Sequence, residues 1–216
     1  MAFFGFTPSQ ELLNAIELSH QKKNATEPLY PLRNQIALLI NDEVIDAIIT
    51  NLLHRFPKGE KRDIAEKLAG YVKASVSTLL KQFLGKASNT QVKKSIEFSE
   101  KSLFKDAANN QLLGAALDPR LVSSLKLTYA EILLGNEINK QALAELYKQF
   151  AESTVRHFIT DFNKTLELGM IKQKVADIGA AGVIKAIHIA IDKIIPHLSK
   201  SELKILAEYH DTLFHY

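Results

Sequence analysis

Two histidine–aspartate pairs are the residues in this sequence best suited by type and spacing to chemistry. His157 precedes Asp161 by four positions, and His188 precedes Asp192 by the same spacing. Residues four apart lie on one face of a helix, so each pair could orient a general base or supply two metal ligands. The alternative for each pair is an ordinary hydrogen bond at a surface or half-buried position, and we expect that outcome.

Other catalytic and metal-binding signals are weak. The chain has no cysteine, which excludes disulfides, zinc–thiolate sites and a cysteine nucleophile. Glu17 and His20 have the spacing of a di-iron ligand pair, but no second Glu-x-x-His follows. No H-E-x-x-H, G-x-S-x-G or Walker motif is present. We therefore predict no catalytic residues, no metal ion and no cofactor. We expect the tail histidines His197, His210 and His215 to be exposed.

The segment 175–198 is the most informative for binding. It is apolar around most of a helix, which is typical of a helix in the centre of a fold. Its polar residues fall at spacings of three and four and so form a narrow stripe. One hypothesis is that the stripe edges a pocket between helices that holds an apolar ligand with an acidic head. The alternative is a solvated strip or a satisfied polar network. The candidate ligand-binding residues are Lys185, His188, Asp192, Ile184, Ile187 and Ile191.

Helices must position all of these residues, because the whole chain reads as helical. Glycines and prolines are few, nine and six, and alternating strand patterns are absent. Thr7-Pro8 marks the start of the first helix, and we expect "MAFFGF" before it to form a plug over that helix. A loop is expected at 24–33. Further helices are expected at about 34–56, 60–84, 90–105, 118–135, 137 or 140–168, 171–195 and 200–214. The predicted fold is all-α: a mainly antiparallel bundle of about eight or nine helices.

The last two helices meet at an elbow. Pro196 cannot extend the preceding helix, and Ser199 with Glu202 has the spacing of a capping box. Leu203, Leu206 and Leu213, together with His210, would form one face of the final helix. Segment 44–67 aligns without gaps on segment 186–209, which suggests two related helical hairpins.

The stretch from Leu198 to Leu203, continuing to Leu206 and Tyr209, is similar to the closing motif of a family of small bacterial helical proteins, many of them exported. The resemblance implies a helical hairpin and no particular activity.

Composition is that of an ordinary globular protein. The net charge is +3 and 46% of residues are hydrophobic, so nucleic acid is not expected as a partner. The chain starts without the basic and apolar regions of a signal peptide, and it has no long uncharged segment that could be inserted stably in a membrane. We expect a cytoplasmic, bacterial protein with one domain over 1–216, whose halves would be 1–88 and 89–216. Basic residues between Arg55 and Lys94 could bind a membrane surface only if they shared a face with "MAFFGF".

Three classes of function remain open. The leading one is a non-enzymatic interaction or scaffold protein with a protein partner or a second copy of itself, because no catalytic set stands out. The second is a carrier or sensor of an apolar small molecule. The third is a metal-dependent or hydrolytic enzyme that uses a His–Asp pair. A cavity lined by Ile184, Ile187 and Ile191 would favour the second class, and a filled core with an exposed apolar face would favour the first.

Overall fold

Long helices build most of the protein in the computed structural model, which describes all 216 residues. Helices hold 72% of the residues, and a small four-stranded antiparallel sheet joins them, so the predicted mainly helical fold is confirmed. In chain order the elements are β1 (Phe3–Phe6), α1 (Gln10–Gln21), α2 (Tyr30–Ile45), α3 (Asn51–Leu53), α4 (Glu60–Phe83), α5 (Asn89–Lys101), β2 (Leu103–Lys105), β3 (Gln111–Ala116), α6 (Pro119–Leu133), α7 (Lys140–Val155), α8 (Phe162–Thr165), α9 (Met170–Ile194), α10 (Lys200–His210) and β4 (Phe214–His215).

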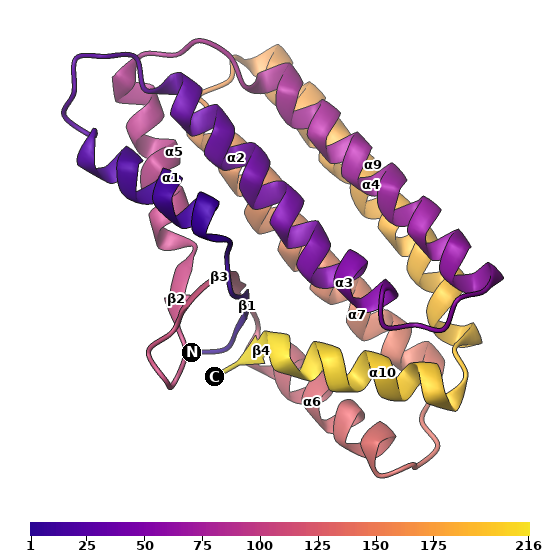
Figure 1. Cartoon of the computed structure of the whole chain (residues 1–216). Coiled ribbons are helices and arrows are strands. Elements are labelled where there is room, and N and C mark those ends of the chain that lie inside the picture. Colours follow the sequence, from indigo (N-terminus) through magenta and orange to yellow (C-terminus); the bar gives the residue numbers. More distant parts are fainter.

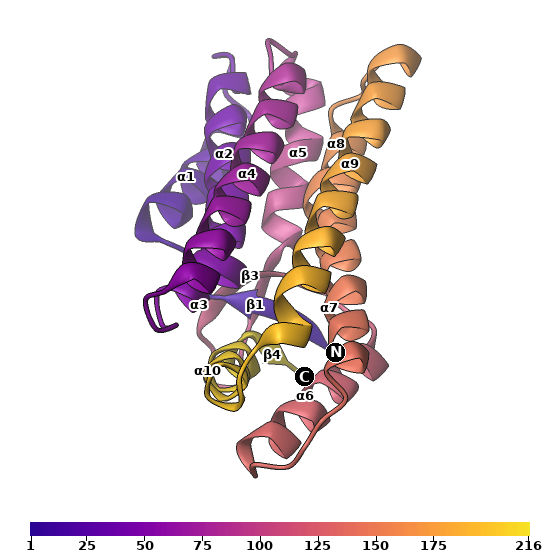
Figure 2. The ribbon, with the colours of Figure 1, turned by 90° about the vertical axis from the view of Figure 1, so that its right-hand side faces the viewer.

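Four rods form the central bundle. The first is α2 with α3, and the third is α7 with α8; in each, a π-helical turn joins the two parts, so the helix is continuous. We call Asp46–Thr50 the first π segment and Arg156–Asp161 the second. Helix α4 packs back along α2, α9 packs back along α7, and α4 also lies against α9 (Figures 1 and 2). The bundle therefore consists of two antiparallel pairs.

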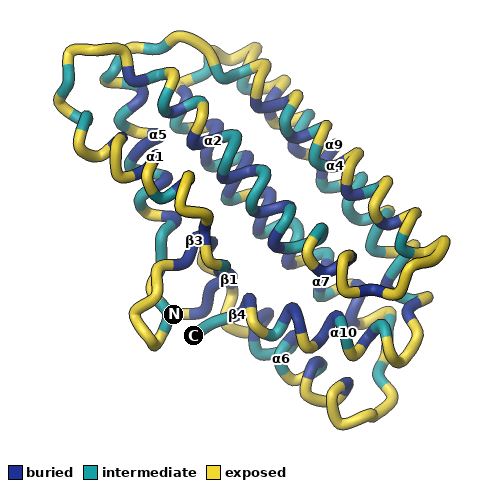
Figure 3. The backbone as a smooth tube through the Cα atoms, viewed as in Figure 1, coloured by how far each residue is buried: buried dark blue, intermediate teal, exposed yellow.

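Shorter elements cover the bundle. Helices α1 and α5 pack on α2, while α6 and α10 pack on each other at the opposite end (Figure 1). The sheet has the order β2-β3-β1-β4. Phe4 of β1 and Phe214 of β4 both pack their rings against Phe150 of α7, which anchors the sheet to the bundle. Most of β1 and β3 is buried (dark blue in Figure 3).

The sheet is absent from the sequence-based prediction. "MAFFGF" is not a plug over α1: it forms β1, an inner strand whose Phe3 pairs with Ala116 of β3 and His215 of β4. Burial of Phe3 and Phe4 also removes the aromatic arm that a membrane-surface site would need. The first helix begins later than predicted, at Gln10, because Ser9 and not Thr7 accepts the capping hydrogen bond, from the Leu12 amide. The predicted loop 24–33 is shorter than expected, because α2 already begins at Tyr30. The helices predicted at 90–105 and 200–214 end earlier, at Lys101 and at His210.

The two aligned hairpins differ in the direction of the chain beyond the elbow. Helix α4 returns along α2, whereas α10 turns away from α9 and packs on α6 (Figure 1). The first limb of one hairpin holds a π segment, and the first limb of the other ends in the 3-10 turn Ile195–His197. The elbows also differ in capping, since Gly59 precedes α4 without a side-chain cap and Ser199 forms a capping box with Glu202, so the two segments do not form one hairpin structure.

Helix α9 does not lie in the centre of the fold. Only Ala176, Ala180 and Val183 are buried along its 25 residues, so most of its apolar circumference is exposed or half-buried. It packs on α4 and α7 and forms one edge of the bundle. The expectation of a central helix is therefore wrong, and the side that packs on α4 is lined by small residues: a Cβ on Gly179 would lie 2.4 Å from Leu79 Cδ1.

Candidate functional site: an apolar cavity in the helical bundle

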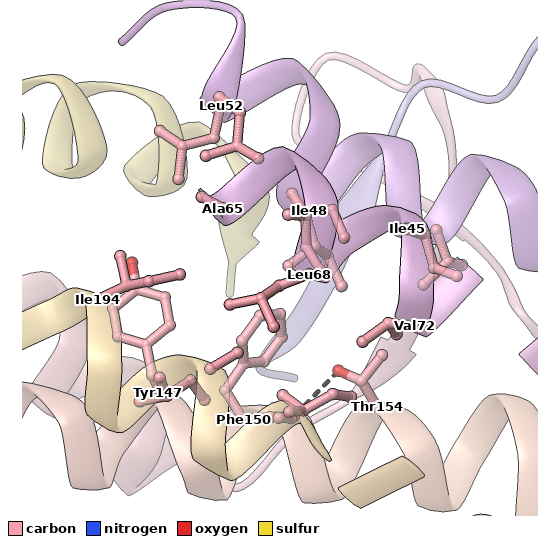
Figure 4. Close-up of a pocket in the computed structure, with 18 of the residues that line it drawn as sticks. Ile45, Ile48, Leu52, Ala65, Leu68, Val72, Tyr147, Phe150, Thr154 and Ile194 are labelled. Carbon is pink, nitrogen blue, oxygen red and sulfur yellow. Dashed lines mark hydrogen bonds between the residues drawn. The ribbon is translucent and has the colours of Figure 1, made fainter. Parts of the chain in front are cut away.

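A cavity of about 180 Å³ lies inside the bundle, near the end that α10 covers. Of the 29 residues that line it, 26 are hydrophobic, and they come from α2, α3, α4, α7, α9, α10 and both π segments. Figure 4 shows side chains from opposite helices pointing toward this space, among them Ile48, Leu68, Val72, Phe150 and Ile194. The arrangement can hold an apolar group, since it offers contacts and almost no polar atoms.

The two π segments border the cavity. The first contributes Ile48 and Ile49, and the second contributes Phe158 and Ile159. A π turn holds one more residue per turn than the α-helix around it and so changes the direction of the side chains beyond it. Such turns are rare and often lie at functional sites. Here they border the cavity from two different rods, α2 with α3 and α7 with α8.

Helix α10 supplies hydrogen bonds to the first π segment. The Tyr209 hydroxyl donates to the Ala47 carbonyl oxygen at 2.6 Å, and His210 Nε2 lies 2.9 Å from the Ile48 carbonyl oxygen. A carbonyl oxygen can only accept, so Nε2 carries the hydrogen. Neutral His210 then accepts at Nδ1 from the Tyr147 hydroxyl, which in turn accepts from Tyr129 at 2.9 Å. These bonds form a buried polar chain that ends at the cavity wall.

Burial controls the charge of His210. The residue is 2% exposed, and desolvation lowers its pKa to about 4 from an ordinary value of 6.5. His210 is therefore neutral at pH 7 and adds no charge to the cavity. Its burial corrects the expectation that the tail histidines are exposed, although the predicted apolar face of the last helix does include it. His197 is exposed and His215 is half-buried.

The candidate residues of α9 divide between the cavity and the outside. Ile187 and Ile191 line the cavity, and Ile184 packs against a neighbouring core cluster. The polar stripe does not reach the cavity. Asp192 pairs with Lys148 of α7 at 2.8 Å, and Lys185 is exposed. The structure therefore brings two of the six candidate residues together at the cavity.

His188 is the third residue of the stripe and faces α7. Its Nε2 lies 3.3 Å from a carboxylate oxygen of Glu152, yet it is buried without a hydrogen bond of good geometry. The short distance alone does not make a hydrogen bond, because a hydrogen bond weakens steeply when its angle is poor. Of the stripe, Asp192 thus pairs with α7 and His188 lies beside Glu152 of α7, while Lys185 is exposed.

Neither His–Asp pair forms a catalytic unit. Asp161 pairs with Lys164 at 2.7 Å, and His157 Nε2 lies 2.9 Å from Ser102 Oγ. Ser102 donates its only hydrogen to the Phe98 carbonyl oxygen, so it accepts from His157 and is not activated as a nucleophile. Ser102 is also completely buried, and burial lowers the pKa of His157. His20, the candidate di-iron ligand, bonds to Glu100 at 2.7 Å.

Sequence reasoning missed most of the cavity lining, which lies on α2, α4 and α7. One usable signal was Asn41, a polar residue on the helix face that carries Val44, Ile45 and Ile48. Asn41 lines the cavity and is 8% exposed. Its carboxamide nitrogen, Nδ2, is buried without a hydrogen-bond partner.

The fold and the cavity define a mainly helical protein with an internal apolar site. Comparison of the chain with protein-family models, curated proteins and solved structures finds no match. The resemblance of the final hairpin to a bacterial family is thus without support from these comparisons. None of the helices is both long enough and apolar enough to cross a membrane.

Proposed function

We propose that the protein is a carrier or sensor that binds a small apolar molecule in the bundle cavity. The observation that carries this proposal is a space of about 180 Å³ whose lining is almost entirely hydrophobic. A dry apolar cavity of about 150 Å³ is large enough for benzene. The site is therefore suited in size and polarity to a ring or a short branched chain.

Energetics support a role for this space. Side chains that border an unfilled apolar space lack the dispersion contacts that a packed core would give them, so the empty space lowers stability. An apolar ligand would recover part of this cost by filling the space and contacting its walls.

A ligand could enter the cavity between α4 and α9, where these two helices face each other. Most lining residues of α2 and α4 are buried, but Leu68, Ile187 and Ile191 are only half-buried. Lys61 at the start of α4 binds the elbow between α9 and α10. It donates to the His197 carbonyl oxygen at 2.9 Å and to a Glu202 carboxylate oxygen at 3.2 Å. Separation of α4 from the elbow would widen the opening.

Binding of a hydrocarbon tests this function directly. Methylenecyclohexane should shift the methyl NMR signals of Ile187 and Ile191 in a saturable manner. Ala190→Leu, which adds three carbon atoms to the cavity wall, should weaken binding at least tenfold. Ala181→Leu is the matched control, since Ala181 is exposed on the same helix and does not line the cavity. Absence of saturable shifts in the wild-type protein would reject the proposal.

A second function, self-association, is supported by an exposed apolar face on α9. Ile171, Val175 and Ile178 share one side of the helix, and Ile171 is 83% exposed. Two copies could cover such a face symmetrically. Sedimentation velocity should then show a dimer that grows with concentration and is lost in the Ile171→Lys/Ile178→Lys variant but kept in Ile64→Lys on α4. A wild-type monomer at every concentration would rule this function out.

A further inference from the structure

Asn41 lines the apolar cavity and carries an amide nitrogen without a hydrogen-bond partner. Its side chain lines the cavity from α2 and is 8% exposed, and Nδ2 has no hydrogen-bond partner. A buried amide N–H group without a partner is costly, because it has lost its bonds to water and gained none. The position therefore calls for an acceptor that the protein itself does not supply.

The other polar groups of the lining have already used their hydrogens. Thr154 donates to the Phe150 carbonyl oxygen at 2.9 Å. His210 donates to Ile48, and Tyr147 donates to His210. A buried water generally needs two to four polar partners. Near Asn41 the lining offers few other polar groups, so a water there would lack partners. The free N–H hydrogens of Asn41 are thus the distinctive polar feature of the cavity.

No lysine or arginine lines the cavity. A carboxylate bound there would be buried without a counter-charge, which is strongly unfavourable. This argues against the acidic head that was expected beside Lys185, since Lys185 is exposed and lies away from the cavity.

We propose that the ligand is an uncharged, mainly apolar molecule with one hydrogen-bond acceptor, a ketone or ester carbonyl oxygen, to which Asn41 Nδ2 donates. This inference rests on the proposed binding function and adds the chemical class of the ligand. The volume suits a molecule of about seven to nine non-hydrogen atoms, slightly larger than benzene.

A matched pair of probes tests the inference. Cyclohexanone and methylenecyclohexane have nearly the same shape and differ in one atom, an oxygen acceptor in place of a CH₂ group. Their dissociation constants are measured by NMR titration in the wild-type protein, in Asn41→Leu and in Asn163→Leu. Leucine has nearly the shape of asparagine without its donor. Asn163 is a matched control because it is buried and has an unpaired carboxamide but does not line the cavity.

We expect the affinity ratio of ketone to alkene to fall about tenfold in Asn41→Leu and to change less than twofold in Asn163→Leu. Cyclohexanecarboxylate at pH 7 should bind more weakly than either probe. In the wild-type protein, the side-chain amide signals of Asn41 should move with cyclohexanone more than with the alkene, which provides a test that needs no variant.

The outcomes separate the two proposals. If both probes bind but the ratio is the same in wild type and Asn41→Leu, or if the carboxylate binds best, the ligand class is wrong while apolar binding stands. If Asn41→Leu does not fold, the amide signals of the wild-type protein decide the question. If neither probe binds, the cavity function itself fails.

Discussion

His210 joins three parts of the molecule through its two ring nitrogens. Nε2 bonds the carbonyl of Ile48 in the first π segment, Nδ1 accepts from Tyr147 of α7, and the residue itself belongs to α10. The bond from Tyr147 requires the neutral imidazole, because a protonated Nδ1 cannot accept, whereas Nε2 donates to Ile48 in either charge state. The charge state of one side chain thus governs how α10 is held beside the cavity.

Acid should destabilise the protein through His210. Its folded pKa, about 4, lies below the ordinary value of 6.5, so between these values the unfolded chain binds a proton that the folded chain does not. The His210 contribution is complete above about pH 6.5 and is lost as the pH falls to about 4, a change of about 3 kcal/mol. Urea denaturation at a series of pH values measures it.

His157 has a lowered pKa as well and adds a slope of the same sign, so the comparison needs a variant. His210→Gln should flatten the pH dependence between 7 and 4, whereas His197→Gln, at an exposed position, should keep it. Equal slopes in wild type and His210→Gln would show that His210 is not the titrating group.

Asn41 should reduce the stability of the empty protein. Replacement of an unpaired buried carboxamide by an apolar group of the same shape removes its desolvation cost, so Asn41→Leu should raise the free energy of unfolding by about 1–2 kcal/mol. Asn34→Leu, on the same helix, should not stabilise, because the Asn34 amide oxygen accepts from Arg33 Nε at 2.7 Å. A loss of stability in Asn41→Leu would mean that Asn41 has a partner.

Two glycines show how differently the elements tolerate a methyl group. A Cβ on Gly114 of β3 would lie 1.8 Å from the Phe4 carbonyl oxygen and 2.8 Å from Gly5 Cα, both backbone atoms of β1. A Cβ on Gly70, within α4, would meet nothing within 4 Å. The first glycine is required for the close approach of two strands, and the second only weakens a helix.

Alanine at these positions should change stability in opposite directions. Gly114→Ala should lower the free energy of unfolding by about 3 kcal/mol, because the clash can be relieved only by moving β1 away from β3. Gly70→Ala should raise it by about 0.5–1 kcal/mol. Thermal denaturation of the two variants beside the wild type measures both changes, and a neutral Gly114→Ala would contradict the strand packing.

The helices were predictable where local chemistry sets their ends. The start of α4 at Glu60 and the Ser199–Glu202 capping box of α10 occur as predicted, and α6 begins at Pro119, one residue after the predicted start, with Asp118 as its cap. The strands were not predictable in this way. β3 reads "QLLGAA", which is rich in helix formers, and its partner β1 lies more than a hundred residues away. Long-range pairing overrode the local preference.

The candidate site was harder to predict than the helices. Periodicity locates the buried side of an amphipathic helix, but α9 is apolar nearly all round, so its sequence does not say which side faces inward. Asp192 and His188 lie against Lys148 and Glu152 of α7, and these partners lie 44 and 36 residues earlier in the chain. The cavity depends on both π segments and on side chains from several helices, none of which a single helix pattern reveals.

At the scale of the whole molecule, the apolar space makes the protein sensitive to pressure. The volume decrease on unfolding scales with the unfilled space in the fold, here about 180 Å³, because water fills such space when the chain unfolds. Unfolding should therefore be accompanied by a decrease in system volume. The chain has no tryptophan, so high-pressure NMR is the suitable measurement.

Ala190→Leu should reduce the size of this volume change, and Ala181→Leu should leave it unchanged. Identical volume changes in both variants would place the compressible space elsewhere. A bound hydrocarbon should have the same effect as the larger side chain, so hydrostatic compression would unfold the empty protein first and spare the occupied one. The pressure at which the protein unfolds would then report whether the cavity is empty or occupied.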